Sequence, residues 1–211
     1  MAYFPAFLEL AGRRCLVVGG GVVAERRVES LVAAGAAVTV VSPALTPRLA
    51  GLAAEGRLAH LARDYRDGDL AGAVLAFAAT DTGDVNAAVA AEGRRCSVWV
   101  NAADDPAHCD FILPALVRRG ELTVAVSTGG TSPALARAVR EELERYLTIE
   151  YVTLAEIAAE ARRELRAAGR VADAAAWRRA LAPDVRRLIV EHGREAAKRH
   201  VLERLGVIAC A

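Results

Sequence analysis

A glycine-rich turn near the amino terminus has the residue types and spacing of a dinucleotide-binding turn. It reads Gly19-Gly20-Gly21-Val22-Val23-Ala24, a G-x-G-x-x-A pattern between an apolar run and a helical pattern. The first glycine permits a tight turn, the second lets the backbone approach a pyrophosphate, and the small third residue lets the helix pack closely. The helix N-terminus at Val22 and Val23 then offers N–H groups to the phosphates. The alternative is a tight strand–helix turn that binds nothing.

The adenosine end of such a site departs from the usual pattern. A carboxylate commonly ends the second strand and holds the ribose hydroxyls, but Ser42 and Pro43 occupy that place here. A serine can donate to a ribose and does not repel a 2′-phosphate, so selection of NAD over NADP stays open.

A polar loop, Asn101-Ala102-Ala103-Asp104-Asp105-Pro106, follows another apolar run. Ligands of open parallel sheets bind outside the carboxyl ends of the strands, so a carboxylate here could act as an acid or base. Asp104 or Asp105 could instead simply cap the turn at Pro106. His108 and Cys109 are close in sequence, but a lone loop histidine is more often a solvated surface residue.

A third segment combines glycines with hydroxyl groups: Thr128-Gly129-Gly130-Thr131-Ser132-Pro133. Ser132 is expected to be a helix N-cap with Pro133 at the first helical position. Such a turn at a helix N-terminus is a candidate anion-binding site. Plain N-capping would also explain it.

The elements that must position these segments alternate in the first half of the chain. Apolar runs predict strands at 14–18, 37–41, 58–61, 73–79 and 97–101, and helices are predicted at 22–34, 45–55 and 85–93. Alternation of this kind predicts an α/β fold with a Rossmann-type doubly wound parallel sheet. After about residue 113 we expect one more strand at 122–127, then a helix with an apolar stripe at helical spacing. From Ile149 onward only helices are expected, broken near Gly169 and at Pro183.

Composition narrows the class of protein. The chain has 211 residues, of which 54% are apolar and 25% charged, and its net charge is +1. That is a soluble globular composition without the basic excess of a nucleic-acid binder. The amino terminus has neither a basic start nor a long apolar run, so no signal peptide or membrane span is expected. Four well-separated cysteines fit reduced thiols in the cytoplasm and no metal cluster, with Cys15 and Cys96 expected to be buried.

Five segments in order give the chain a family resemblance: 4–8, 17–27, 78–86, 101–106 and 125–133. The sequence resembles precorrin-2 dehydrogenases of siroheme biosynthesis, including the amino-terminal part of bifunctional siroheme synthases. The resemblance covers essentially the whole chain. It implies an NAD-binding Rossmann domain at 1–113, a dimerisation segment at 114–148 and a helical domain at 149–211. Siroheme synthases carry a methyltransferase module after this region, so that step is expected from another protein.

The resemblance implies NAD-dependent oxidation of precorrin-2 to sirohydrochlorin by a cytoplasmic homodimer, with Asp104 as the catalytic acid/base. The expected cofactor-binding residues are Gly19, Gly21, Val22, Val23, Ser42, Pro43 and Thr80. Since precorrin-2 is a polycarboxylate, an anion-binding surface is needed. The expected substrate-binding residues are Thr128, Gly129, Gly130, Thr131 and Ser132, with Arg118, Arg119, Arg137 and Arg140 as secondary candidates. Asp105 stands at a position that varies in the family.

Two alternatives stay open. The enzyme could also insert ferrous iron into sirohydrochlorin, with Asp104 accepting the pyrrole protons, and this needs no tightly bound metal. A protein of another class, an NAD-sensing regulatory domain, is disfavoured because such domains usually keep an acidic residue at the end of the second strand, where Ser42 stands. An unrelated small-molecule dehydrogenase is disfavoured to a similar degree.

Overall fold

A computed structural model describes residues 3–208 of the chain. The chain divides into two compact units, with the boundary between Ile112 and Leu113. The sequence places this boundary one residue later. Within the described residues, no helix has the length and apolar character needed to cross a membrane.

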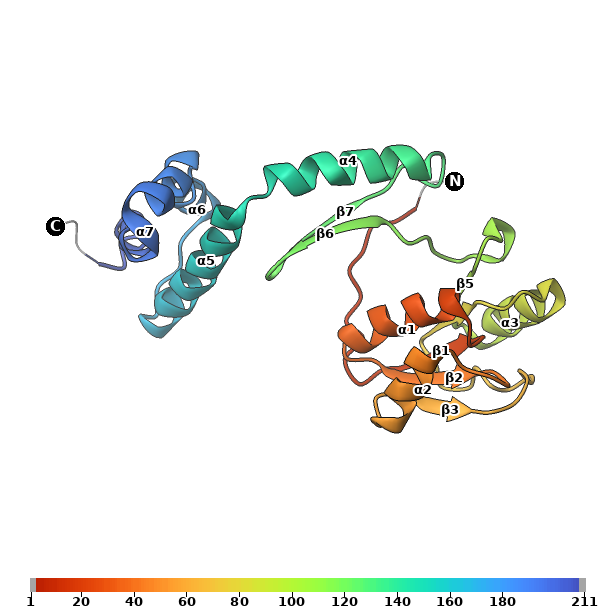
Figure 1. Ribbon diagram of the computed structural model, residues 1–211. Coiled ribbons are helices and arrows are strands. Elements are labelled where there is room, and N and C mark those ends of the chain that lie inside the picture. Colours follow the sequence, from red (N-terminus) through yellow and green to blue (C-terminus); the bar gives the residue numbers. More distant parts are fainter. Residues whose placement is uncertain (1–2, 209–211) are drawn as a thin grey trace. The chain divides into compact units, whose positions relative to one another are not determined.

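The first unit is built on a five-stranded parallel sheet in the order β3-β2-β1-β4-β5 (Figure 1). Its strands are β1 (Arg14–Val18), β2 (Ala37–Val41), β3 (Ala59–Leu61), β4 (Leu75–Ala78) and β5 (Trp99–Ala102). Its helices are α1 (Val22–Ala33), α2 (Pro47–Ala54) and α3 (Gly83–Cys96), with a short 3-10 turn, η1 (Pro106–His108). Strand order reverses between β1 and β4, which confirms the predicted Rossmann-type doubly wound sheet.

Several element bounds differ from the predicted ones. β1 and β2 match the prediction residue for residue, whereas α3 extends beyond the predicted 85–93 at both ends. Helix α2 begins at Pro47 rather than Leu45 because the Thr46 side chain accepts a hydrogen bond from the Leu49 N–H, 3.2 Å away. Such an N-cap followed by proline fixes where a helix starts.

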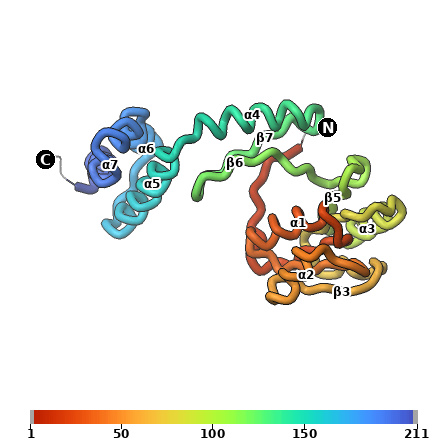
Figure 2. The backbone as a smooth tube through the Cα atoms, in the orientation of Figure 1, coloured from red at the N-terminus to blue at the C-terminus, as the bar shows by residue number. Residues whose placement is uncertain are grey.

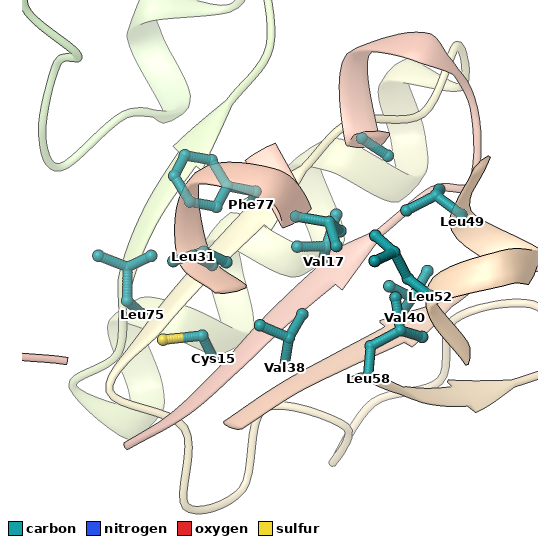
Figure 3. Close-up of a cluster of buried hydrophobic side chains, with 12 residues drawn as sticks. Cys15, Val17, Leu31, Val38, Val40, Leu49, Leu52, Leu58, Leu75 and Phe77 are labelled. Atoms are coloured by element: carbon teal, nitrogen blue, oxygen red, sulfur yellow. The ribbon is translucent and has the colours of Figure 1, made fainter. Parts of the chain in front are cut away.

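The side chains of β1 alternate between two cores, one on each face of the sheet. Cys15 and Val17 join the core covered by α1 and α2, which is shown in Figure 3. Leu16 and Val18 join the other core, beneath α3. A parallel strand buried on both faces produces this continuous apolar run. The predicted burial of Cys15 is confirmed; that of Cys96 is wrong, because it is the exposed last residue of α3.

The second unit opens with an antiparallel hairpin of β6 (Ala115–Arg119) and β7 (Leu122–Val126). The sequence predicts β7 but misses β6, in which Val117 alone is fully buried and two arginines close the strand. Gly120 at φ 56° makes the turn between them. Helix α4 (Pro133–Tyr146) follows and lies along the hairpin (Figure 1).

Three further helices complete the second unit: α5 (Ile149–Ala167), α6 (Ala174–Ala180) and α7 (Pro183–Arg204). Helices α5 and α7 lie side by side (Figure 2) and enclose a core that includes Ile157 and Val201. The predicted breaks near Gly169 and at Pro183 are confirmed, and Gly193 adds a kink within α7. The division between 114–148 and 149–211, and the dimerisation role of the former, stay predictions.

A buried carboxylate holds the loop between β3 and β4 in place. Glu92 of α3 is 1% exposed and accepts hydrogen bonds from the Tyr65 hydroxyl and from the N–H groups of Gly68 and Leu70, both at 3.0 Å. Burial and the bond to Glu92 raise the pKa of Tyr65. Because a buried carboxylate is stable only when its acceptor sites are filled, Glu92 and this loop order each other.

We expect Glu92→Ala to lower the free energy of unfolding by about 3 kcal/mol, since the buried Leu70 N–H, the partly buried Gly68 N–H and the Tyr65 hydroxyl lose their partner. Urea unfolding measures the loss. Amide hydrogen exchange at Gly68 and Leu70 should accelerate in the same variant. The control, Glu142→Ala, removes an exposed glutamate from the surface of α4 and should change stability little. Equal stabilities of the two variants would contradict this role.

Candidate functional site

The glycine turn between β1 and α1 is fixed by close backbone contacts. Gly19 has φ 116°, and a Cβ atom there would lie 2.3 Å from the carbonyl oxygen of Ala79. A Cβ atom on Gly20 would lie 1.9 Å from the carbonyl oxygen of Ala44. The backbones that follow β4 and β2 therefore exclude side chains at both positions. Sequence reasoning assigned Gly19 to this turn but missed the need for glycine at position 20.

Gly21 stands in a different environment. A Cβ atom there would meet no protein atom within 4 Å. Gly21 is the N-cap of α1, and no side chain caps this helix. The N–H groups that begin α1 at the exposed Val22 and Val23 can therefore meet a ligand. Free space beside an uncapped helix N-terminus fits the pyrophosphate of a dinucleotide.

Ser42, at the end of β2, is engaged within the protein. The residue is 8% exposed, and its hydroxyl donates to the carbonyl oxygen of Ala44 at 2.8 Å. Its own carbonyl lies 2.8 Å from Nε2 of His60. Ser42 thus shapes the loop that packs beneath Gly20, whereas the next residue, Pro43, is exposed. Binding of the cofactor by these two residues stays a prediction.

The turn after β4 depends on a buried asparagine. Asn86 is 6% exposed; its Oδ1 accepts a bond from the Thr80 hydroxyl at 2.9 Å, and its Nδ2 donates to the Thr80 carbonyl at 3.0 Å. Thr80 is therefore held at the carboxyl end of β4, beside the strand-order reversal where ligands bind. Asn86 lies in a segment that carried the family resemblance, but sequence reasoning gave it no role.

Asp104 lies in a strained turn directly after β5. It has φ 57°, in the left-handed region that residues other than glycine rarely adopt and that asparagine and aspartate tolerate best. The turn is tied to the sheet because Ala103 N–H donates to the Ala78 carbonyl at 2.8 Å and Asp105 N–H donates to that of Ala102 at 3.4 Å. The Asp104 side chain is exposed. Backbone strain held in this way is concentrated at functional sites.

The segment after Asp104 is folded back onto β5. Asn101, which is buried, donates to the Phe111 carbonyl at 2.9 Å, and Asp110 accepts a bond from Val100 N–H at 2.8 Å. His108 is not isolated, since its Nδ1 lies 2.5 Å from Oδ2 of Asp105. This bond lowers the pKa of Asp105. Asp105 is the N-cap residue of η1 but makes no side-chain capping hydrogen bond there, because its carboxylate pairs with His108. Among the described residues, no hydrogen bond engages the Asp104 carboxylate.

Arg27 of α1 is a charged neighbour of this loop that sequence reasoning missed. Burial lowers the pKa of its guanidinium, and the charge of Asp104 acts in the opposite direction. Burial raises the pKa of the nearby Cys109 thiol. No local sequence signal marks Arg27, because its position depends on how α1 packs against the sheet.

The Thr128-to-Ser132 turn belongs to the second unit. Its hydroxyls are engaged locally: Ser132 accepts from Leu135 N–H at 3.2 Å, Thr131 donates to the Thr128 carbonyl at 2.6 Å, and Thr128 donates to that of Ser132 at 3.0 Å. The predicted N-cap is confirmed. Gly129 and Gly130 both have positive φ and open space beside them. Substrate binding by this turn stays a prediction.

Two of the four arginines that were secondary candidates for substrate binding form ion pairs within the protein. Arg119 and Arg140 both contact Glu144, and Arg140 also contacts Glu141. Within residues 3–208, no group of three or more histidine, cysteine or acidic side chains could hold a metal ion. The described residues therefore offer two functional features, which are the uncapped N-terminus of α1, suited to a phosphate, and the exposed carboxylate of Asp104.

Comparison with known families agrees with this architecture. A family described as NAD(P)-binding matches residues 6–115, more than half of the chain. A second, described as "Sirohaem biosynthesis protein central", matches residues 119–146. The first unit is thus an NAD(P)-binding domain.

Two individual relatives are siroheme synthases. Siroheme synthase of Methylobacillus flagellatus is 50% identical over 162 residues, which are 77% of this chain and 35% of that protein. Siroheme synthase of Thioalkalivibrio sulfidiphilus is 43% identical over 208 residues, 97% of this chain and 42% of that protein. The chain therefore spans about two fifths or less of these two curated relatives.

One solved structure matches nearly end to end. That of SirC, precorrin-2 dehydrogenase, superposes with a TM-score of 0.74 at 26% identity and covers 98% of this chain and 100% of that one. The chain belongs to the NAD(P)-binding family whose model matches residues 6–115, and it carries the central segment of sirohaem biosynthesis proteins at residues 119–146.

Two glycine variants separate folding from cofactor binding. Gly21→Ala should weaken NAD binding at least tenfold, because the added methyl group occupies the open space beside the helix N-terminus, and should change the free energy of unfolding by less than about 1 kcal/mol. Gly20→Ala should be clearly less stable than the parent, because the Ala44 carbonyl must move. Calorimetric titration with NAD and urea unfolding measure the two quantities. Undiminished NAD affinity in Gly21→Ala would place the cofactor elsewhere.

The left-handed turn at Asp104 predicts a stability series. Asp104→Ala should lose about 1 kcal/mol, since alanine pays the full penalty of a left-handed backbone. Asp104→Asn should keep the stability of the parent, because asparagine tolerates this conformation as well as aspartate does. Urea unfolding of both variants distinguishes the strained turn from a relaxed one, in which alanine would cost nothing.

Proposed function

We propose that this chain catalyses the NAD-dependent oxidation of precorrin-2 to sirohydrochlorin in siroheme biosynthesis. The observation that carries the proposal is the exposed Asp104, held in a strained turn at the carboxyl end of β5 in an NAD(P)-binding domain. The nearly complete overlap with SirC, precorrin-2 dehydrogenase, supports the choice of substrate. Siroheme synthases among the relatives support the pathway.

In this proposal the α1 N-terminus binds the cofactor and Asp104 acts as the base. The uncapped α1 N-terminus and Gly21 bind the pyrophosphate of the cofactor, which when bound supplies the acceptor for the hydride that precorrin-2 loses. Asp104 accepts the proton that leaves the macrocycle, so that one hydride and one proton are removed in total. The turn fixes the backbone of Asp104 before substrate arrives, which reduces the entropy lost in reaching the reactive geometry.

The finer assignments belong to the same proposal. We infer NAD rather than NADP from the family resemblance, and a homodimer formed through residues 114–148. The Thr128-to-Ser132 turn would bind substrate carboxylates through the N–H groups at the start of α4. Ferrous iron insertion is a second candidate activity, since an exposed carboxylate such as Asp104 can also accept pyrrole protons.

Asp104→Asn tests the acid/base role without disturbing the turn. The parent should form sirohydrochlorin and NADH when incubated with precorrin-2 and NAD. The variant should do so at least about 100-fold more slowly, because the amide cannot accept the proton. Its affinity for NAD should be unchanged. Absorbance of the macrocycle and of NADH follows the reaction.

Asp105→Asn is the matched control, because its carboxylate already pairs with His108 and it should retain most of the rate. A near-normal rate in Asp104→Asn would contradict the assignment. Sirohydrochlorin mixed with ferrous iron and no NAD tests the chelatase activity separately. Replacing NAD by NADP tests which cofactor is used.

A further inference from the structure

Arg27 reaches from α1 toward the Asp104 loop through a stack of aromatic contacts. Its guanidinium carbon lies 5.7 Å from the centre of the Phe77 ring. Phe77 packs edge-on against Phe111, with 5.6 Å between ring centres. The Phe111 carbonyl is bound by Asn101, which precedes Asp104 by three residues. Arg27 thus stacks on Phe77 of β4, which in turn packs against the segment that follows Asp104.

The guanidinium of Arg27 has a donor that the protein does not use. Its Nε is buried, and within residues 3–208 it is the one buried side-chain nitrogen or oxygen without a hydrogen-bond partner. Arg63 offers a contrast, since it is engaged by the carboxylate of Asp69. Burial of an unpaired charged donor costs free energy, so such a group is a candidate to receive an anion.

The phosphates of the cofactor are not expected to be the anion that Arg27 binds. Arg27 follows Gly21 by six residues, or about 9 Å along the helix axis at the rise of an α-helix. The phosphates are expected at the opposite end of that stretch, on the N-terminus of α1. Asp104 is close enough for its charge to act on Arg27, but no hydrogen bond joins the two side chains among the described contacts.

We propose that Arg27 binds a carboxylate of the tetrapyrrole substrate. The planar guanidinium donates to carboxylates with defined geometry, and stacking on Phe77 limits its rotation. Arg27 is then a specificity-determining residue within the same unit as the catalytic carboxylate. This inference rests on the proposed oxidation of precorrin-2.

The test compares Arg27→Gln with Arg26→Gln, which removes an exposed arginine from the adjacent position. Arg27→Gln should raise the KM for precorrin-2 about 10- to 100-fold, the usual worth of a charge-assisted hydrogen bond, while kcat changes less than about threefold. The KM for NAD should not change. Arg26→Gln should leave all three constants near those of the parent. The Kd of sirohydrochlorin, measured by fluorescence titration, should rise with the KM for precorrin-2.

An unchanged KM for precorrin-2 in Arg27→Gln would overturn the inference. So would a fall in kcat at constant KM, since Arg27 would then act on Asp104 rather than on substrate. If Arg27→Gln does not fold, as judged by circular dichroism, Arg27→Lys replaces it: the charge remains but the Nε donor is lost, and KM should still rise. Failure of the parent chain to oxidise precorrin-2 would refute the proposed function instead, and sirohydrochlorin binding would still test Arg27.

Discussion

The close approach of three backbone segments at the glycine turn is the constraint on which the first unit depends. The carbonyl of Ala79 after β4 and that of Ala44 after β2 occupy the space in which Gly19 and Gly20 would carry side chains. This contact joins the ends of neighbouring strands and sets where α1 begins. Because α1 starts without a side-chain cap, its N–H groups are left for a ligand at the point where strand order reverses.

The second part of the site uses backbone geometry in a similar way. Asp104 is held left-handed by hydrogen bonds from its two neighbours to the ends of β4 and β5. The Asp105 carboxylate is hydrogen-bonded to His108, so the two adjacent acids have different surroundings. Few side chains need to be placed accurately, since the sheet supplies most of the positioning. A fold of this kind can retain its nucleotide site while the loops around it adapt to a particular substrate.

Local signals were enough to predict much of this from the sequence. The strand at 14–18, the glycine turn and the Ser132 cap each depend on residues that are neighbours in the chain, and all three are confirmed. The strand at 115–119 was missed because a half-exposed hairpin strand ending in two arginines has no long apolar run. Cys96 was misjudged because an apolar neighbourhood in sequence does not decide which face of a helix is buried.

The sequence by itself determined the doubly wound fold, the glycine-rich turn between β1 and α1 and the NAD(P)-binding class of the first unit, because periodicity, capping and short motifs are local properties. Only the tertiary structure decided that position 20 has no room for a side chain and that the Ser42 hydroxyl donates to the Ala44 carbonyl. It also decided that Arg27 lies beside the Asp104 loop. These facts depend on contacts between segments far apart in the chain. Whether a donor is free or already bonded follows from such contacts, and the free donors define what the site can bind.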